Sequence, residues 1–170
     1  MESRVKLFGH PLHQMLIVFP LGLLATSVVF DLVSLFGSSA SAATVAHALI
    51  AAGLVGGVLA APWGYMDWLA IPRGTRANAI GAMHGGGNVL VLLMFTASWW
   101  LRMDEPAQAQ SLAYGLSFCG AGIALVTAWL GGELVDRLGV GVSPHAHLNA
   151  RNSLAGPAEP PPETSSARVH

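Results

Sequence analysis

The chain is poor in charged residues and in cysteine. Only 10% of its 170 residues are Asp, Glu, Lys or Arg, whereas a soluble domain carries about 25%. The single Cys119 excludes a disulfide within the chain and a cysteine-based metal cluster. The formal net charge is −1 and no basic stripe is present, so we expect no nucleic-acid partner. This shortage of charge points instead to a protein that contacts the lipid bilayer.

Hydrophobic residues make up 53% of the chain and gather in four long runs. Each run exceeds the roughly 20 residues that cross a ~30 Å hydrocarbon core as a helix. Because lipid offers no hydrogen-bond partners, a run of this length is expected to be helical, so that its backbone groups satisfy one another. The sequence therefore predicts an all-α fold, a four-transmembrane-helix bundle within residues 1–142. The expected helices cover residues 12–36, 43–71, 79–101 and 112–134.

A cleaved signal peptide is the other interpretation of the first run. A segment of small residues, 37–42, resembles a cleavage site. The run is longer than the ~7–15 residues of a signal core, however, and it contains Asp31. We therefore interpret it as the first membrane helix.

The cations are distributed unevenly between the two sides of the four runs. Seven lie before the first run, between the second and third, or after the fourth, whereas Arg102 lies on the opposite side beside Asp104 and Glu105. Because cations are retained in the cytoplasm, this pattern predicts a multi-pass protein with both termini cytoplasmic. Trp99 and Trp100 then lie near the outer interface, where indole rings prefer to sit. The seven cations are Arg4, Lys6, Arg73, Arg76, Arg137, Arg151 and Arg168.

From Ser143 onward the composition changes to Pro, Ala, Ser and Glu. Such a segment cannot bury a core, so residues 143–170 are predicted to form a disordered cytoplasmic tail. His145 and His147 belong to this tail, and we interpret them as incidental rather than as a metal site.

The four runs contain a weak internal repeat. A tryptophan and a carboxylate stand four residues apart in the second run and again in the fourth, and a histidine stands near the start of the first and third runs. This order predicts two tandem helical hairpins in the same orientation, with the first and third helices on one diagonal of the bundle. The matched residues are Trp63 and Asp67, Trp129 and Glu133, and His13 and His84.

Ionisable residues inside membrane helices usually face the interior of the bundle and have partners. We therefore expect His13 and His84 to approach one another in the cytoplasmic half, with Asp67 and Glu133 nearby. His10 and Asn88 complete this polar cluster. In the outer half, Asp31 and His47 are close enough in the first hairpin to pair, but we expect solvent to reach both because they lie near the interface.

Three functions and a purely structural role fit these residues. Two neutral imidazoles, His13 and His84, are suited to ligate one haem b iron. The set His13, His84, Asp67 and Glu133 is suited to a divalent metal such as iron or zinc. The same groups are suited to a proton or ion relay in a small transporter without a cofactor. In the structural role, the histidines only fix the bundle through hydrogen bonds. No nucleophile–base arrangement and no phosphate loop is present, so we do not expect an enzyme.

The glycines around His84 have two interpretations. Gly81 and Gly85 form a small-xxx-small face that lets another helix approach closely. The triplet Gly85, Gly86 and Gly87 would also leave room for a flat macrocycle beside the imidazole. Elsewhere in the apolar runs, Pro20 and Pro62 each lack a backbone donor and are expected to bend their helices.

Four motifs resemble the bacterial predicted-membrane-protein family known as domain of unknown function 2231, over about residues 8–142. The resemblance implies a four-helix bacterial inner-membrane protein without an established activity. Related domains occur beside iron–sulfur modules in some bacterial chains, which implies a membrane redox partner; a homo-oligomer is the other expected assembly. The sequence departs from the family pattern at Gln14 and Leu138. The motifs are residues 9–13, 19–22, 67–76 and 129–135, and the site residues they imply are His10, His13, Asp67, His84 and Glu133.

Overall fold

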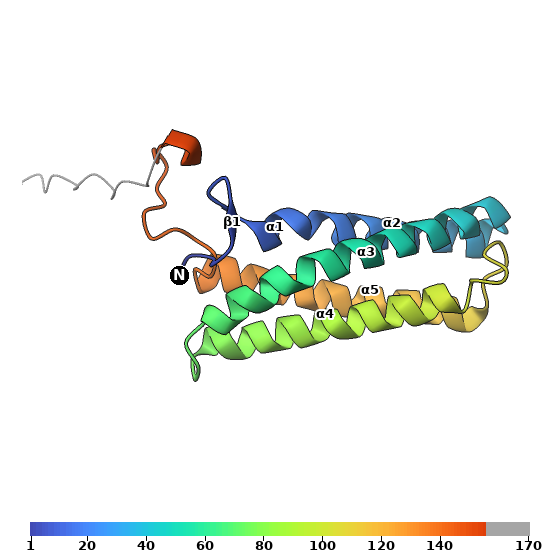
Figure 1. The fold of residues 1–170 in the computed structure, drawn as a ribbon. Coiled ribbons are helices and arrows are strands. Elements are labelled where there is room, and N and C mark those ends of the chain that lie inside the picture. The colour runs from blue at the N-terminus through green and yellow to red at the C-terminus, as the bar shows by residue number, and fades with distance from the viewer. Residues whose placement is uncertain (156–170) are drawn as a thin grey trace, which may run out of the picture.

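Four long antiparallel segments of helix form the body of the protein in its computed structural model, which describes residues 1–155 (Figure 1). Each is long and apolar enough to cross a membrane. The all-α, four-helix bundle predicted from the sequence is thereby confirmed. The predicted tail falls partly outside the described residues, from 156 to 170. The helices are α1 (Leu12–Leu16), α2 (Val18–Gly37), α3 (Ala40–Ala70), α4 (Arg76–Trp100) and α5 (Ser111–Gly132), and a π-helical turn (Glu133–Arg137) continues α5.

Polar caps set the ends of the helices. The Ser39 side chain accepts a hydrogen bond from the backbone N–H of Ala42, so α3 begins before the apolar run does. Thr75 accepts in the same way from the backbone of Asn78 and starts α4. Both helices therefore begin three residues earlier than predicted, because a cap extends a helix into residues that hydropathy alone does not include.

The two prolines differ in their effect. The first membrane segment is divided at Ile17, between α1 and α2, three residues before Pro20. Because Pro20 has no N–H, the carbonyl four residues earlier loses its usual helical partner, which accounts for the break. In contrast, α3 runs without interruption through Pro62.

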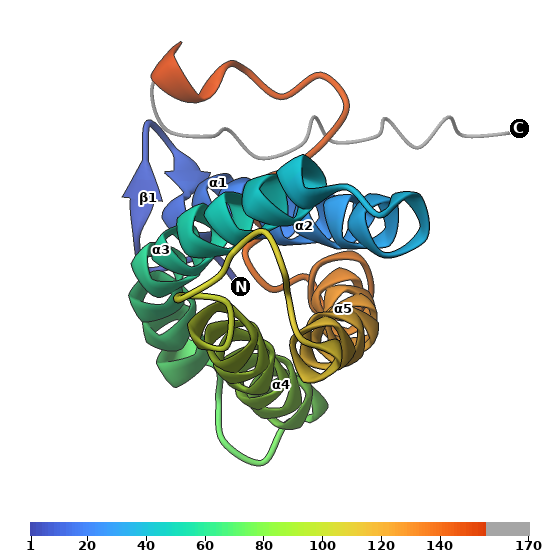
Figure 2. The same cartoon turned by 90° about the vertical axis from the view of Figure 1, so that its right-hand side faces the viewer.

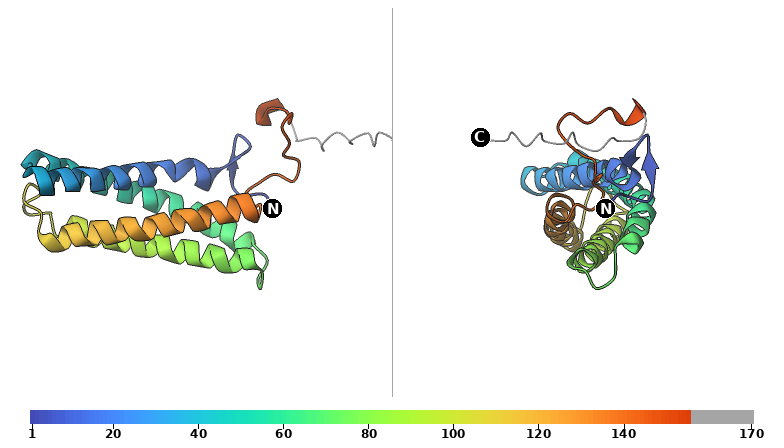
Figure 3. Two further views of the ribbon diagram at one scale, coloured as in Figure 1. Left: turned by 180° about the vertical axis from the view of Figure 1, so that it is seen from behind. Right: turned by 90° about the vertical axis from the view of Figure 1, so that its left-hand side faces the viewer.

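The helices are arranged as two hairpins that pack side by side. In the first hairpin α2 packs against α3, and in the second α4 packs against α5; α3 also contacts α4, and α2 contacts α5. The end view in Figure 2 shows that α2 and α4 consequently lie on one diagonal and α3 and α5 on the other. This is the predicted parallel-repeat arrangement. The N-terminus and the last described residues lie at the same end of the bundle (Figure 3).

A short hairpin that the sequence did not predict precedes α1. Strand β1 (Lys6–Leu7) pairs antiparallel with β2 (His10–Pro11), and the turn between them places Phe8 and Gly9 at φ values of 52° and 86°. The chain before it contacts the bundle through Ser3, which is buried. At the other end of the described chain, a 3-10 turn (Ser153–Ala155) lies beside this hairpin.

The core is small and most large apolar side chains face outward. Leu24, Ile50, Val91 and Phe95 form the buried cluster. Phe36, by contrast, is 82% exposed, as are many other apolar side chains to lesser degrees. A protein in water rarely exposes so many large apolar side chains, so this surface is suited to hydrocarbon.

Candidate functional site

His13 is held between α1 and α3. Its Nδ1 lies 3.0 Å from the carbonyl oxygen of Ala60. A carbonyl can only accept, so Nδ1 carries a proton and donates it; in the neutral ring the lone pair is then on Nε2. The ring packs so closely on Gly64 that a Cβ there would lie 2.7 Å from Cε1 of His13.

His84 is held in the same way between α4 and α5. Its Nδ1 donates to the carbonyl oxygen of Thr127 at 2.8 Å, and a Cβ at Gly131 would lie 3.1 Å from its Cε1. Nδ2 of Asn88 lies 3.2 Å from Nε2 of His84. The Asn88 amide nitrogen can only donate, so both neighbours fix the neutral Nδ1–H tautomer. Oδ1 of Asn88 in turn accepts from the Thr127 hydroxyl at 3.0 Å.

The two histidine sites are equivalent in the repeat. His13 and His84 are 71 residues apart, and each donates to the carbonyl located four residues before the glycine that its ring contacts. Gly64 in α3 and Gly131 in α5 are therefore equivalent residues, and 67 positions separate them. The sequence match of Trp63 with Trp129 implied a separation of 66. The predicted alignment of the second helices was therefore wrong by one position, because it matched side-chain type rather than close contact.

Asp67 and Glu133 have partners other than the imidazoles. The two carboxylate oxygens of Asp67 accept from the Ser3 hydroxyl at 2.7 and 2.8 Å, and one also accepts from the backbone N–H of Arg4. Glu133 forms an ion pair with Arg76 at 2.6 Å. Within residues 1–155, no three His, Cys, Asp or Glu side chains gather in a way that could hold a metal ion. The four-ligand arrangement is therefore not assembled in the described part of the chain.

His10, the remaining predicted member of the polar cluster, lies apart from the bundle. It is exposed on strand β2, and its Nε2 lies 3.4 Å from the Ser153 hydroxyl. Of the residues predicted for the cluster, only Asn88 forms a hydrogen bond with one of the two membrane histidines among the described contacts.

The glycines near His84 serve two different purposes. Gly81 and Gly87 are close-contact positions, since a Cβ would lie 2.7 Å from Trp68 and 2.5 Å from Thr127 respectively. No atom lies within 4 Å of where a Cβ of Gly85 or Gly86 would stand. Gly81 is thus a close-contact position, as predicted. Gly85, its partner in the predicted small-xxx-small face, is exposed and meets no neighbouring atom, so that part of the prediction was wrong.

A second polar cluster, in the other half of the bundle, is built around Arg102 and Asp31. The guanidinium binds the carboxylate in bidentate fashion, with N–O distances of 2.5 and 2.9 Å, and both side chains are 0% exposed. Nη2 of Arg102 also lies 3.0 Å from the hydroxyls of Ser98 and Ser117. The expectation that solvent reaches Asp31 was wrong. The chain just beyond α4 turns the guanidinium back between the helices, where only a full ion pair is tolerated.

Aromatic rings surround this ion pair. His47 stacks on Trp99 with ring centroids 5.5 Å apart, and the Arg102 guanidinium lies 5.2 Å from the centre of the Tyr114 ring. The Tyr114 hydroxyl lies 3.0 Å from that of Ser34. Among the described residues, buried side-chain atoms of this cluster remain without a hydrogen-bond partner. They are Nδ1 of His47, Nε1 of Trp99 and Nε of Arg102.

Both polar clusters lie in a region of the chain that matches a known family. The family described as predicted membrane protein (DUF2231) matches residues 9–144. The chain belongs to this family. No curated protein and no solved structure matches the chain. The DUF2231 region contains all four candidate spans, so the family, the helices and the apolar surface agree on a multi-pass membrane protein.

Proposed function

We propose that this DUF2231 protein holds a haem b group between His13 and His84 and carries electrons within the membrane. One observation carries the proposal: each imidazole donates its Nδ1 proton to a backbone carbonyl. Histidines that bind metals almost always donate their other N–H to such an acceptor, which fixes the tautomer and makes the free nitrogen more basic. Haem iron held by two histidines exchanges single electrons.

The charge state of the two histidines fits a haem group. A histidine that holds haem iron must be neutral. The Asn88 amide, as a donor to Nε2, favours the neutral ring of His84, and the Thr127 carbonyl keeps the proton of that ring on Nδ1. A carboxylate bonded to the ring would favour the protonated form instead. Asp67 and Glu133 are engaged by Ser3 and Arg76, so neither is bonded to an imidazole in the described contacts.

The donor set also fits in position. Two histidines that would hold one haem iron between them would need similar depth in the bundle. His13 and His84 occupy equivalent positions in two hairpins of the same orientation, and this equivalence supports similar depth. Gly64 and Gly131 hold the rings in place. Iron bound at Nε2 of His84 would take the place of the Asn88 amide, which lies 3.2 Å from that atom.

An absorbance spectrum tests the proposal. Protein purified from haem-replete cells should show a Soret band that shifts on reduction with dithionite. His13→Ala and His84→Ala should each lose the band, because a single axial histidine holds haem b weakly. His10→Ala is the matched control, since His10 is exposed on β2. A colourless wild-type protein, or a band that survives both substitutions, would contradict the proposal.

A proton relay without a cofactor is the second candidate, and the polar cluster around Asp31 and Arg102 favours it. Ionisable groups inside a membrane bundle often mark an ion path, and Asp31, Arg102 and His47 lie together there with unpartnered nitrogen atoms. Proton flux into liposomes that contain haem-free protein, lost in His47→Ala, would support the relay. No flux above that of empty liposomes would leave the bundle with a structural role.

A further inference from the structure

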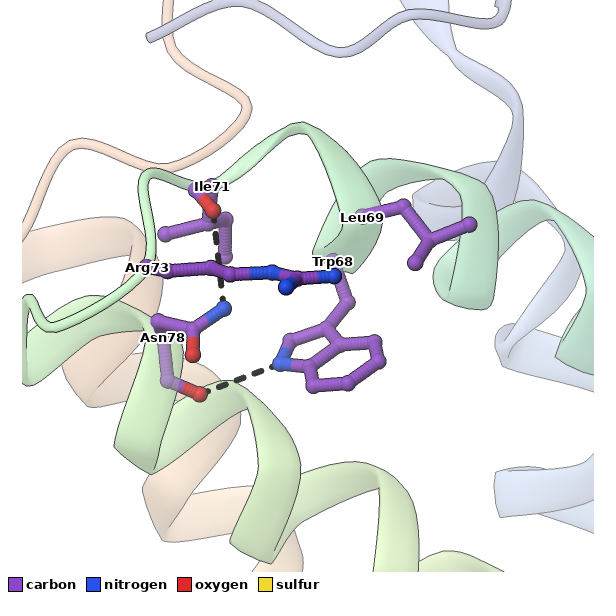
Figure 4. Close-up of a pocket in the computed structure, with 5 residues that line it drawn as sticks. All are labelled: Trp68, Leu69, Ile71, Arg73 and Asn78. Carbon is purple, nitrogen blue, oxygen red and sulfur yellow. Dashed lines mark hydrogen bonds between the residues drawn. The ribbon is translucent and has the colours of Figure 1, made fainter.

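A pocket of about 260 Å³ opens at the turn between α3 and α4. Figure 4 shows the side chain of Arg73 extending across this pocket toward Trp68. We propose that the pocket binds the phosphate headgroup of an anionic phospholipid and that the Arg73 guanidinium contacts the phosphate. This proposal is independent of the haem proposal. The pocket is lined by Trp68, Leu69, Ile71, Arg73 and Asn78.

The wall of the pocket is fixed before any ligand binds. Nε1 of Trp68 donates to the backbone carbonyl of Asn78 at 3.0 Å, and the indole packs against Gly81. The Asn78 amide lies 3.5 Å from the carbonyl of Ile71. Because the indole N–H is already used, a ligand meets an apolar ring face there, and the guanidinium provides its polar contact.

The charge of Arg73 favours an anion. The carboxylates of Asp67 and Glu133 already have other partners: Asp67 accepts from Ser3, and Glu133 pairs with Arg76. Among the ion pairs of the described residues, none includes Arg73, whose side chain is exposed. A guanidinium offers parallel N–H donors that match the oxygens of a phosphate group, so a phosphate monoanion or diester complements this residue.

The position of the pocket favours a lipid as the source of the phosphate. It lies where α3 ends at Ala70 and the chain leaves the apolar span. Tryptophan and arginine are both enriched at this boundary, where headgroup phosphates lie. Leu69 forms one wall and is 52% exposed on the apolar surface, so an acyl chain can follow that wall while the phosphate meets Arg73.

Native mass spectrometry of the purified protein in detergent, with equimolar phosphatidylglycerol and phosphatidylcholine, tests the proposal. Wild-type protein should retain phosphatidylglycerol preferentially. Arg73→Gln should retain about tenfold less of it, the effect expected for loss of one charged hydrogen-bonding partner. Arg73→Lys should fall between the two, because it keeps the charge but not the paired donors.

Arg4→Gln is the matched control, since it removes one exposed cation from the same end of the bundle. It should retain phosphatidylglycerol within about twofold of wild type, as a single distant surface charge contributes little. Equal losses in Arg4→Gln and Arg73→Gln, or equal retention of both lipids by wild type, would overturn the proposal. Displacement of the lipid by millimolar inorganic phosphate would also overturn it, in favour of a soluble anion.

Discussion

Asp31 and Arg102 occupy equivalent positions in the two hairpins, 71 residues apart, and pair with each other inside the bundle. The same spacing relates His13 to His84. When a bundle is built from two similar hairpins, the first helix of one hairpin faces the first helix of the other. Equivalent residues near the central axis therefore lie opposite each other. Identical charges there would repel, whereas an acid in one hairpin and a base in the other join the two halves in one register.

Removing one member of this pair should strongly destabilise the protein. Asp31→Asn or Arg102→Gln leaves an uncompensated buried charge, which costs about 3–5 kcal/mol. Unfolding in detergent, followed by circular dichroism, measures the loss. The double variant Asp31→Arg/Arg102→Asp should recover part of the lost stability. Ser27 is buried one turn before Asp31, as Ser98 is one turn before Arg102, so it could contact the new arginine as Ser98 contacts Arg102. A double variant no more stable than the worse single one would contradict the proposed equivalence.

Alanine at the glycines that contact the imidazoles should displace the rings. In Gly64→Ala the added Cβ would lie 2.7 Å from Cε1 of His13, and in Gly131→Ala 3.1 Å from Cε1 of His84. The first substitution should therefore lower the melting temperature more than the second. Gly85→Ala is the control: its Cβ meets no atom within 4 Å, so the higher helix propensity of alanine should stabilise it by up to about 1 kcal/mol. Equal melting temperatures for all three variants would contradict this interpretation of the close contacts.

The carboxyl group of Glu2 should titrate below its usual range. Hydrogen bonds from Lys6 and then from Ser143 lower the pKa of Glu2 below 4.5. Because the folded-state pKa is the lower one, the pairing stabilises the N-terminal segment above about pH 4.5 and is lost as the pH falls through the lowered value. An NMR titration of the Glu2 carboxyl carbon measures the midpoint. Lys6→Gln should raise the midpoint more than Ser143→Ala does, and the reverse order would contradict the assigned causes.

The helices could be predicted from the sequence because a bilayer restricts the solutions for a long apolar run. The buried ion pair could not. Arg102 stands in the sequence beside Asp104 and Glu105, and only the turn after α4 carries its guanidinium back to Asp31. From local spacing, Asp31 and His47 were close enough to pair but were expected to be solvated. Charge pairing depends instead on which helices meet.

The histidine sites were predicted in part, for a related reason. His13 and His84 stood out as ionisable groups in apolar runs. Their partners are the backbone carbonyls of Ala60 and Thr127, and every residue type carries such an oxygen. The glycines four residues after these carbonyls, Gly64 and Gly131, could have indicated where the imidazoles pack. A ring can approach a helix backbone closely only where no Cβ intervenes. Asp67 and Glu133 were predicted as members of the cluster because they are carboxylates, but Asp67 binds Ser3 in the N-terminal segment and Glu133 binds Arg76 at the start of α4.

The distribution of cations predicts the orientation of the bundle in the membrane, and labelling tests this prediction. The native Cys119 is exposed, so Cys119→Ala provides the background. In intact cells, a membrane-impermeant maleimide should label Asp104→Cys, in the loop after α4. Arg4→Cys, near the N-terminus at the opposite end of the bundle, should be labelled only after the membrane is opened. This outcome is expected because the ends that carry Arg4, Arg73 and Arg137 should remain in the cytoplasm. Labelling of Arg4→Cys in intact cells, with Asp104→Cys protected, would reverse the orientation and move the Arg73 pocket to the outer leaflet.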